Sequence, residues 1–163
     1  MSIDPDHFRR AMAQFATGIT VVTTRDAGGR LLGLTANAFC SVSLSPPLVL
    51  VCVGERSETH VGFRESGRFG VSVLAEGQKA LSERFALPGS GKFENVPVLT
   101  GPGGLPLLEG ALAHVECRIW ADYPGGDHTI YLGEVEHVQV FGGRPLLFHG
   151  SLYLGLKGEG AGA

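Results

Sequence analysis

Several features by which protein classes are recognised are missing from this 163-residue sequence. Lysine and arginine form no basic run, and the formal net charge is −3. Nucleic acids and anionic membranes require a basic patch, so we expect neither as a partner.

No apolar stretch is long enough to span a membrane, and the N-terminal MSIDPDHFRR lacks the apolar core of a signal peptide. We therefore expect a cytoplasmic protein.

Metal and disulfide chemistry also lack their usual residue patterns. Cys40, Cys52 and Cys117 are an odd number in no paired spacing, which indicates neither a disulfide framework nor a zinc site. Six histidines show no HxxxH or HxH spacing, so no metal site is expected. Without a GxSxG elbow, the serines have no hydrolase context.

Two nucleotide-binding motifs are excluded as well. Gly89–Lys92 resembles part of a phosphate-binding P-loop, but Phe93 stands where that motif needs Ser or Thr to bind magnesium. Its first glycine is missing too, because that position is Ala86. Strands and helices do not alternate as βαβ units, so a Rossmann domain is not expected.

The amino-acid composition is that of an ordinary globular domain. Hydrophobic residues make up 44% and charged residues 18% of the chain, and the length is that of one domain with a buried core. The 25 glycines are well above the usual share and show no collagen period, so they indicate turns, bulges and close backbone approach. We expect one domain over residues 1–156 and a disordered tail over 157–163.

The first half of the chain predicts two helices around a set of strands. Asp4-Pro5 begins a helix that Gly18 ends, with an apolar stripe that we expect in the core or in a dimer contact: Phe8, Met12 and Phe15. ITVVTTRD and LLGLTANAF form a hairpin around residues 27–30, and a short strand SVSL follows. LVLVCVG is apolar on both faces, which predicts a central strand. Ser57 caps a second helix that Gly67 closes.

The second half predicts mostly hairpins. A strand FGVSVL and a short helix from Gln78 to Phe85 precede a long irregular connection over residues 86–110, a length typical of lids and binding loops. Residues 111–123 alternate as a strand, and HTIYLGEVEHVQVF returns as its partner, with a bulge near Gly133 where the alternation slips. Seven or eight antiparallel strands with two or three short helices predict a closed β-barrel.

The stretch Gly33–Leu50, GLTANAFCSVSLSPPLVL, is the best candidate binding segment. Its small and hydroxyl residues allow the backbone to approach a flat ligand and supply donors to a phosphate. A flavin needs such donors, together with a thin slot for its ring. We therefore interpret this stretch as a flavin cradle.

Several segments together resemble the flavin reductase family. They occur in the order ATGITVVTT, GLTANAFCSVSLSPPLVLVCV, ERSETH, RF, GKF, GGDHTIYLGEV and PLLFHGSLY, and they cover about residues 8–156. This family contains the small NAD(P)H-dependent partners of two-component flavin monooxygenases. The resemblance implies a mainly β, antiparallel, six-stranded Greek-key split barrel (the FMN-binding split barrel) that forms a homodimer. It also implies that the protein binds FMN or FAD and NADH or NADPH, and passes reduced flavin to a separate monooxygenase.

The resemblance also assigns roles to individual residues. His128, in GGDH, matches the histidine that contacts the nicotinamide cofactor. Ala38 stands where the common family form has serine, which removes one hydroxyl donor. The flavin-binding positions implied by the resemblance are Thr35, Ala36, Asn37, Ser41, Val42, Ser43, Cys52, Val53, Ser57, Thr59, Lys92, Phe93 and Tyr153.

Hydride transfer between two cofactors needs no acid, base or nucleophile from the protein, which agrees with the lack of a catalytic constellation in the sequence. The lack of a basic cluster slightly favours NADH over NADPH as the nucleotide. Two alternatives stay open: a flavin-dependent oxidase of the pyridoxamine-phosphate type on the same barrel, and a non-catalytic flavin- or haem-binding or stress-sensing module. The first would need a basic phosphate site for its substrate, and the second would have no use for GGDH.

Overall fold

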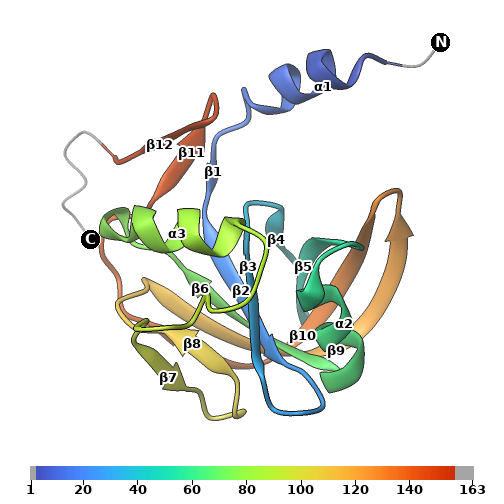
Figure 1. Cartoon of the computed structure of the whole chain (residues 1–163), viewed down its shortest axis with the longest axis vertical. Coiled ribbons are helices and arrows are strands. Elements are labelled where there is room, and N and C mark those ends of the chain that lie inside the picture. Colours follow the sequence, from blue (N-terminus) through green and yellow to red (C-terminus); the bar gives the residue numbers. More distant parts are fainter. Residues whose placement is uncertain (1–2, 157–163) are drawn as a thin grey trace.

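A computed structural model describes residues 3–156, and the expected tail at 157–163 lies outside the described residues. Its main feature is one antiparallel sheet of seven strands (Figure 1). The strands lie in the order β3 (Leu31–Ala36), β2 (Thr20–Arg25), β6 (Arg68–Val73), β9 (Ala113–Gly125), β10 (His128–Val140), β5 (Pro47–Gly54) and β4 (Phe39–Leu44). The mainly β, antiparallel prediction is therefore confirmed, with one strand more than the six that the family resemblance implies.

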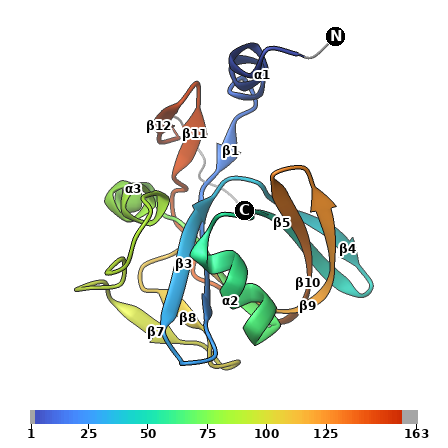
Figure 2. The same ribbon diagram turned by 45° about the vertical axis from the view of Figure 1, so that its right-hand side comes forward.

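The sheet is rolled into a split barrel (Figure 2). Its two edge strands, β3 and β4, follow one another in the sequence and are joined by Asn37-Ala38. At this junction the Cys52 N–H donates to the Ala38 carbonyl over 3.1 Å. This bond extends the pairing of β4 with β5, whereas β3 and β4 do not pair with each other. The expectation of a closed barrel is corrected in this respect.

The barrel interior holds an aromatic and aliphatic core. Phe63 stacks on Phe69 with ring centroids 5.0 Å apart, and Tyr131 meets Phe63 edge-on at 4.9 Å. Gly133 faces the Phe69 ring and the Cys117 Cβ, and the space there leaves no room for a side chain. The register of β9 and β10 shifts between Leu132 and Gly133, which confirms the predicted bulge.

Two of the predicted helices match the structure closely. Helix α2 (Glu58–Ser66) has Ser57 as N-cap and Gly67 as a left-handed C-cap, as expected. Helix α3 (Lys79–Ala86) follows a 3₁₀ turn, η1 (Glu76–Gln78). Helix α1 (Pro5–Met12) begins at the predicted Asp4 cap but ends well before Gly18. The prediction of its end is wrong because the chain extends into strand β1 (Thr17–Gly18) at that glycine.

Strand β1 belongs to a small sheet outside the barrel. It pairs with β11 (Leu147–His149), which in turn pairs with β12 (Leu152–Leu154). Helix α1 projects beyond this sheet, away from the barrel (Figures 1 and 2). The stripe of Phe8, Met12 and Phe15 is exposed, so these residues are not part of the core. Within residues 3–156, no helix is long and apolar enough to cross a membrane.

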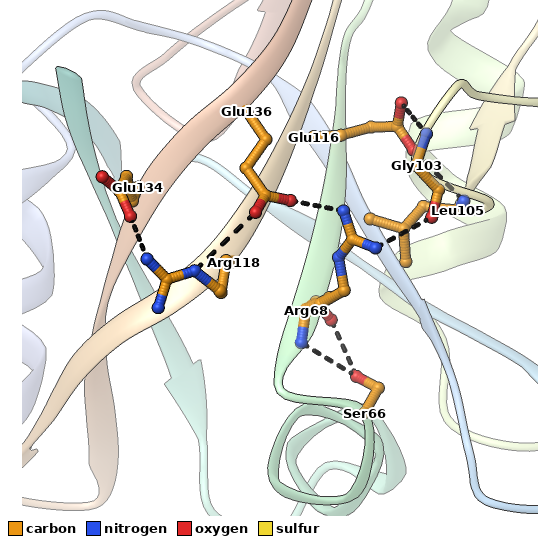
Figure 3. Close-up of polar contacts among 8 residues, drawn as sticks. All are labelled: Ser66, Arg68, Gly103, Leu105, Glu116, Arg118, Glu134 and Glu136. Carbon is orange, nitrogen blue, oxygen red and sulfur yellow. Dashed lines mark hydrogen bonds and ion pairs between the residues drawn. The ribbon is translucent and has the colours of Figure 1, made fainter.

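The 86–110 connection covers the outer face of β6 and β9. It contains one short hairpin, β7 (Val98–Thr100) and β8 (Pro106–Leu108). Beneath it, Glu116 is almost completely buried, and its carboxylate accepts the N–H groups of Gly103 (3.0 Å) and Leu105 (3.2 Å). Figure 3 shows this contact beside ion pairs that cross the strands, Arg68 with Glu136 and Arg118 with Glu134. The polar face of β9 is therefore buried in part, which its alternating sequence did not reveal.

Strand β5 is second from an edge and not central as predicted. Its burial alternates: Val49, Val51 and Val53 point into the core, and the residues between them are only partly buried. Apolar residues on the second face of β5 are therefore not covered by another layer of this chain. One of them, Cys52, lines the cleft described next.

Candidate functional site

A cleft of about 660 Å³ lies at the split of the barrel. One wall is β3, and the other parts come from the end of β5, the N-terminus of α2, His128 at the start of β10, and the segment that follows α3. Figure 2 shows β3 running between α2 and that segment. The volume falls within the range of small-molecule sites. The cleft, a candidate ligand-binding site, therefore lies where the two edge strands of the main sheet do not pair.

The segment 87–94, which we call the cleft wall, is fixed to the barrel by two side chains. Lys92 Nζ donates to the Gly33 and Phe85 carbonyls, each over 3.1 Å. Phe85 and Phe93 meet edge-on with ring centroids 4.9 Å apart. A Cβ at Gly33 would lie 2.9 Å from the Phe85 ring, so only glycine permits this packing. Burial lowers the pKa of Lys92, and its ammonium also meets the carbonyl end of α3, where a cation is favoured.

The N-terminus of α2 opens into the cleft. Ser57 and Thr59 line it, and Ser57 Oγ accepts the Thr59 N–H over 3.2 Å. Arg56 lies directly before the cap and also lines the cleft. Arg30 lines the same region, with its guanidinium bonded to Asp26 at 3.0 Å and to Glu58 at 3.3 Å. The positive end of the helix dipole and the neighbouring Arg56 favour an anion here.

His128 lies beside this anion site. Its Nδ1 is 2.7 Å from Asp127 Oδ1, and this hydrogen bond lowers the pKa of Asp127. On its other side, His128 Nε2 would be 3.7 Å from a Cβ at Gly54, so the ring stands over a residue without a side chain. The turn is joined to the entry of α2, because the Glu55 N–H donates to the Asp127 carbonyl over 3.1 Å.

Many of the predicted site residues meet in this cleft. The lining includes Thr35, Ala36, Asn37, Cys52, Ser57, Thr59, Lys92, Phe93 and His128. Lys92, Ser57 and His128 each have a side-chain atom bonded within the protein, as described above. The Thr35 hydroxyl is also engaged, because it donates to the Ser82 carbonyl over 2.6 Å. Sequence reasoning missed Arg30 and Arg56. For Arg56, its place directly before a helix N-cap was a usable signal.

Other predicted residues do not line the cleft. Ser41, Val42 and Ser43 lie on β4 beyond the junction, and Ser43 Oγ accepts the Ser45 N–H over 3.2 Å. The Val53 side chain is fully buried in the core. Tyr153 lies on β12, with its hydroxyl 2.9 Å from Ser82 Oγ. The structure does not bring these five side chains into the cleft, and their assignment to the flavin stays a prediction.

The cleft residues fit a flat ligand that carries a phosphate. β3 lines the cleft with three leucines as well as Gly33, Thr35 and Ala36, and Asn37 follows directly after it. Gly54 leaves an open surface under His128. The α2 N-terminus with Arg56 supplies donors and positive charge for an anion. A flavin nucleotide combines these two requirements, a planar ring and a phosphate.

Known proteins give the same indication. Residues 12–157 match the family described as "Flavin reductase like domain". A Rhodococcus protein named NADH-dependent flavin reductase is 41% identical over 157 residues, covering 95% of this chain and 88% of that protein. A Streptomyces globisporus protein named NADH-dependent FAD reductase is 48% identical over 141 residues, 82% of this chain and 76% of its own length.

Solved structures agree with the sequence comparisons. The Streptomyces globisporus NADH:FAD oxidoreductase SgcE6, solved with NAD and FAD fragments, superposes with a TM-score of 0.91 at 40% identity, covering 99% of each chain. The flavin reductase PheA2 gives a TM-score of 0.87 at 40% identity, covering 96% of this chain and all of that one. The protein described here therefore belongs to the flavin reductase-like domain family.

Proposed function

We propose that this protein is an NADH-dependent flavin reductase that transfers a hydride from NADH to FMN or FAD. The observation that carries the proposal is the cleft itself, in which an anion-binding helix end and His128 face the same space. The named relatives support the choice of NADH and flavin. A Rhodococcus jostii relative, 38% identical, is named the reductase subunit of a flavin-dependent monooxygenase. We infer that the reduced flavin made here likewise serves a partner monooxygenase.

The flavin side of the site is assigned to β3, the junction and α2. Asn37 is exposed in the cleft and offers an amide to the edge of a ring. The α2 N-terminus, with Ser57 and Arg56, is placed to hold the flavin phosphate. Thr35 and Lys92 shape the wall through their contacts with Ser82, Gly33 and Phe85.

The nicotinamide side is assigned to His128. Its hydrogen bond with Asp127 fixes Nδ1, so that Nε2 is the nitrogen left for a ligand. When bound together, the flavin and the nicotinamide supply the hydride acceptor and the hydride donor. The protein then has to hold two flat rings in contact, and Gly54 below His128 leaves space for this.

Two other functions on the same barrel are less well supported. A flavin-dependent oxidase of the pyridoxamine-phosphate type needs a second basic site for its substrate phosphate. The arginines of the cleft are Arg30, which is bonded to two carboxylates, and Arg56, which is assigned to the flavin phosphate. A flavin- or haem-binding module without activity would leave His128 and its Asp127 contact without a use.

The activity is tested by mixing the protein with NADH and either FMN, FAD or no flavin, and following the absorbance of the nicotinamide. Oxidation that depends on added flavin is expected, faster with NADH than with NADPH. If neither nucleotide is oxidised in the presence of either flavin, the proposal is wrong.

His128→Ala tests the assignment of the nicotinamide side. We expect the KM for NADH to rise about tenfold, the effect of losing roughly 1.4 kcal/mol of binding, while flavin titrations stay unchanged. His137→Ala is the matched control, because His137 lies on the same strand but outside the cleft. An equal loss of flavin affinity in His128→Ala would show that the role assigned to His128 is wrong.

We also propose a homodimer that works in the cytoplasm. Helix α1 exposes Phe8 and Met12, and Phe15 is exposed just beyond its end. Strand β4 exposes Val42 and Leu44, with Leu44 96% exposed. Apolar groups gathered in this way favour a protein partner, and an eight-residue helix without buried residues needs one to be stable. The cysteines at 40, 52 and 117 are free, as is usual in a reducing compartment. Sedimentation should give twice the mass of the 17.1 kDa chain; a monomer at micromolar concentration would contradict the dimer.

A further inference from the structure

The two halves of the proposed site belong to different parts of the barrel. Helix α2, which carries the anion site, packs chiefly against β2 and β3 at one edge of the sheet. His128 begins β10, which lies near the other edge. Hydride transfer needs the two reacting atoms about 3–3.5 Å apart, and a misplacement of about 1 Å can cost a hundredfold in rate. Strand β5 leads into α2 and pairs with β10 as far as Gly54, opposite His128. The entry of α2 is therefore held beside His128, and the direction of the helix axis has still to be fixed.

Two hydrogen bonds join these elements beside the cleft. The Glu55 N–H donates to the Asp127 carbonyl over 3.1 Å, which fixes the point where the chain enters α2. One helical turn further on, His60 Nε2 lies 2.9 Å from Thr129 Oγ1, and the two share a hydrogen bond whose direction follows the His60 tautomer. An entry point alone would let the helix pivot, whereas a second fixed point sets the direction of its axis.

The second hydrogen bond is fully internal. His60 is 8% and Thr129 3% exposed, and both face the barrel interior, whereas the neighbouring Ser57 and His128 line the cleft. Thr129 directly follows His128, so a shift at Thr129 moves the His128 backbone with it. A buried hydrogen bond is directional and strongly maintained, because breaking it leaves a polar group without a partner.

Apolar contacts also hold α2 against β10, but they fix the position of the helix less precisely than a hydrogen bond does. Phe63 meets Tyr131 edge-on with centroids 4.9 Å apart, and His60 meets Tyr131 at 5.9 Å. These ring contacts secure the packing of α2 even without the Thr129 hydroxyl. A substitution that removes the Thr129 hydroxyl should therefore remove the hydrogen bond and leave the fold intact.

We propose that the His60–Thr129 hydrogen bond is a brace that positions the flavin-binding end of α2 relative to His128, and so sets the alignment for hydride transfer. This inference rests on the proposed function. His60 and Thr129 act as positioning residues, since neither lines the cleft. The brace affects the geometry between the two ligands and leaves the separate contacts of each ligand intact.

The test is Thr129→Val, which keeps the shape of the side chain and removes its hydroxyl. We expect kcat to fall about tenfold or more. The dissociation constant of FAD, from fluorescence titration, and that of NAD⁺ for the flavin-loaded protein should each change less than about twofold, because each half-site keeps its own contacts. Thr129→Ser, which restores a hydroxyl, should recover kcat. Thr129→Ala serves in place of Val if the Val variant does not fold.

The matched control is Ser72→Ala. Ser72 is also fully buried, and its Oγ accepts the Leu108 N–H over 2.9 Å, away from the cleft. Both variants should lower the melting temperature, but only Thr129→Val should lower kcat. An unchanged kcat in Thr129→Val, or a loss that Thr129→Ser does not recover, would overturn the brace. Lack of flavin-dependent NADH oxidation in the wild type would instead refute the proposed function itself.

Discussion

Gly33→Ala is a direct test of how the cleft wall is built. The Gly33 backbone is ordinary strand, so the effect of a methyl group depends only on space. An added Cβ would lie 2.9 and 3.1 Å from two atoms of the Phe85 ring and 3.2 Å from Phe93 Cζ. Ordinary contacts begin near 3.4 Å, and Phe85 is fully buried, so it has little freedom to retreat.

The size of the effect follows from this overlap. Forcing one extra carbon into a packed site costs about 1–3 kcal/mol, which corresponds to a fall in melting temperature of about 2–12 °C for a chain of this length. Of the two rings that the added methyl group would touch, Phe93 is the less buried. The strain is therefore relieved most easily if Phe93 and the rest of the cleft wall move outwards. Flavin binding would then have to restore the original position of the wall. If this costs about 1–2 kcal/mol, flavin affinity falls about five- to thirtyfold.

Thermal unfolding by circular dichroism and flavin titration by fluorescence measure both effects. Gly77→Ala is the control, because its Cβ would meet nothing within 4 Å and its backbone is not left-handed. It should match the wild type in both measurements. If Gly33→Ala also matches the wild type, the packing described for the wall is wrong. A lower melting temperature with unchanged flavin affinity would refute the link between wall and flavin.

Two further variants address the walls of the cleft separately. Lys92→Met keeps the apolar stem but removes both hydrogen bonds to the Gly33 and Phe85 carbonyls, so flavin affinity and melting temperature should fall together; an affinity loss with unchanged stability would instead indicate that Lys92 acts on the ligand. Ser57→Ala removes the cap of α2 and costs about 1 kcal/mol of stability. It should weaken FMN binding more than riboflavin binding, and equal losses would show that the phosphate is not held at this helix end.

Features fixed by neighbouring residues were predicted correctly from the sequence. The bounds of α2 depend on a side-chain cap at Ser57 and on a left-handed residue at Gly67, and both signals lie next to the helix that they end. The bulge at Gly133 was visible as a break in alternation within one strand. Such features need no knowledge of the distant chain.

Features that depend on distant segments were not predictable in the same way. Glu116 is buried because Gly103 and Leu105, in the connection between β7 and β8, bring their N–H groups to its carboxylate. The pattern of β9 alone describes this position as a polar face. Similarly, nothing near Phe8 and Met12 indicates that α1 lies away from the barrel.

One pair of assignments could have been judged with elementary geometry. Cys52 and Val53 were both assigned to the flavin, but successive residues of a strand point to opposite faces. In the structure Cys52 lines the cleft and Val53 is buried in the core. The assignment of Ser41, Val42 and Ser43 was harder to judge, since a register shift between Ser41 and Ser43 interrupts the alternation of β4.

The split in the barrel explains why the stretch from Gly33 to Leu50 matters for function. A closed barrel satisfies every strand edge and would leave no cleft at this place. Here Asn37 and Ala38 lead the chain from one sheet edge to the other, and the Ala38 carbonyl accepts the Cys52 N–H of β5. The edges diverge on either side of this junction, and the cleft opens beside β3. The same short junction therefore both links the two edges of the sheet and creates the space that we assign to flavin.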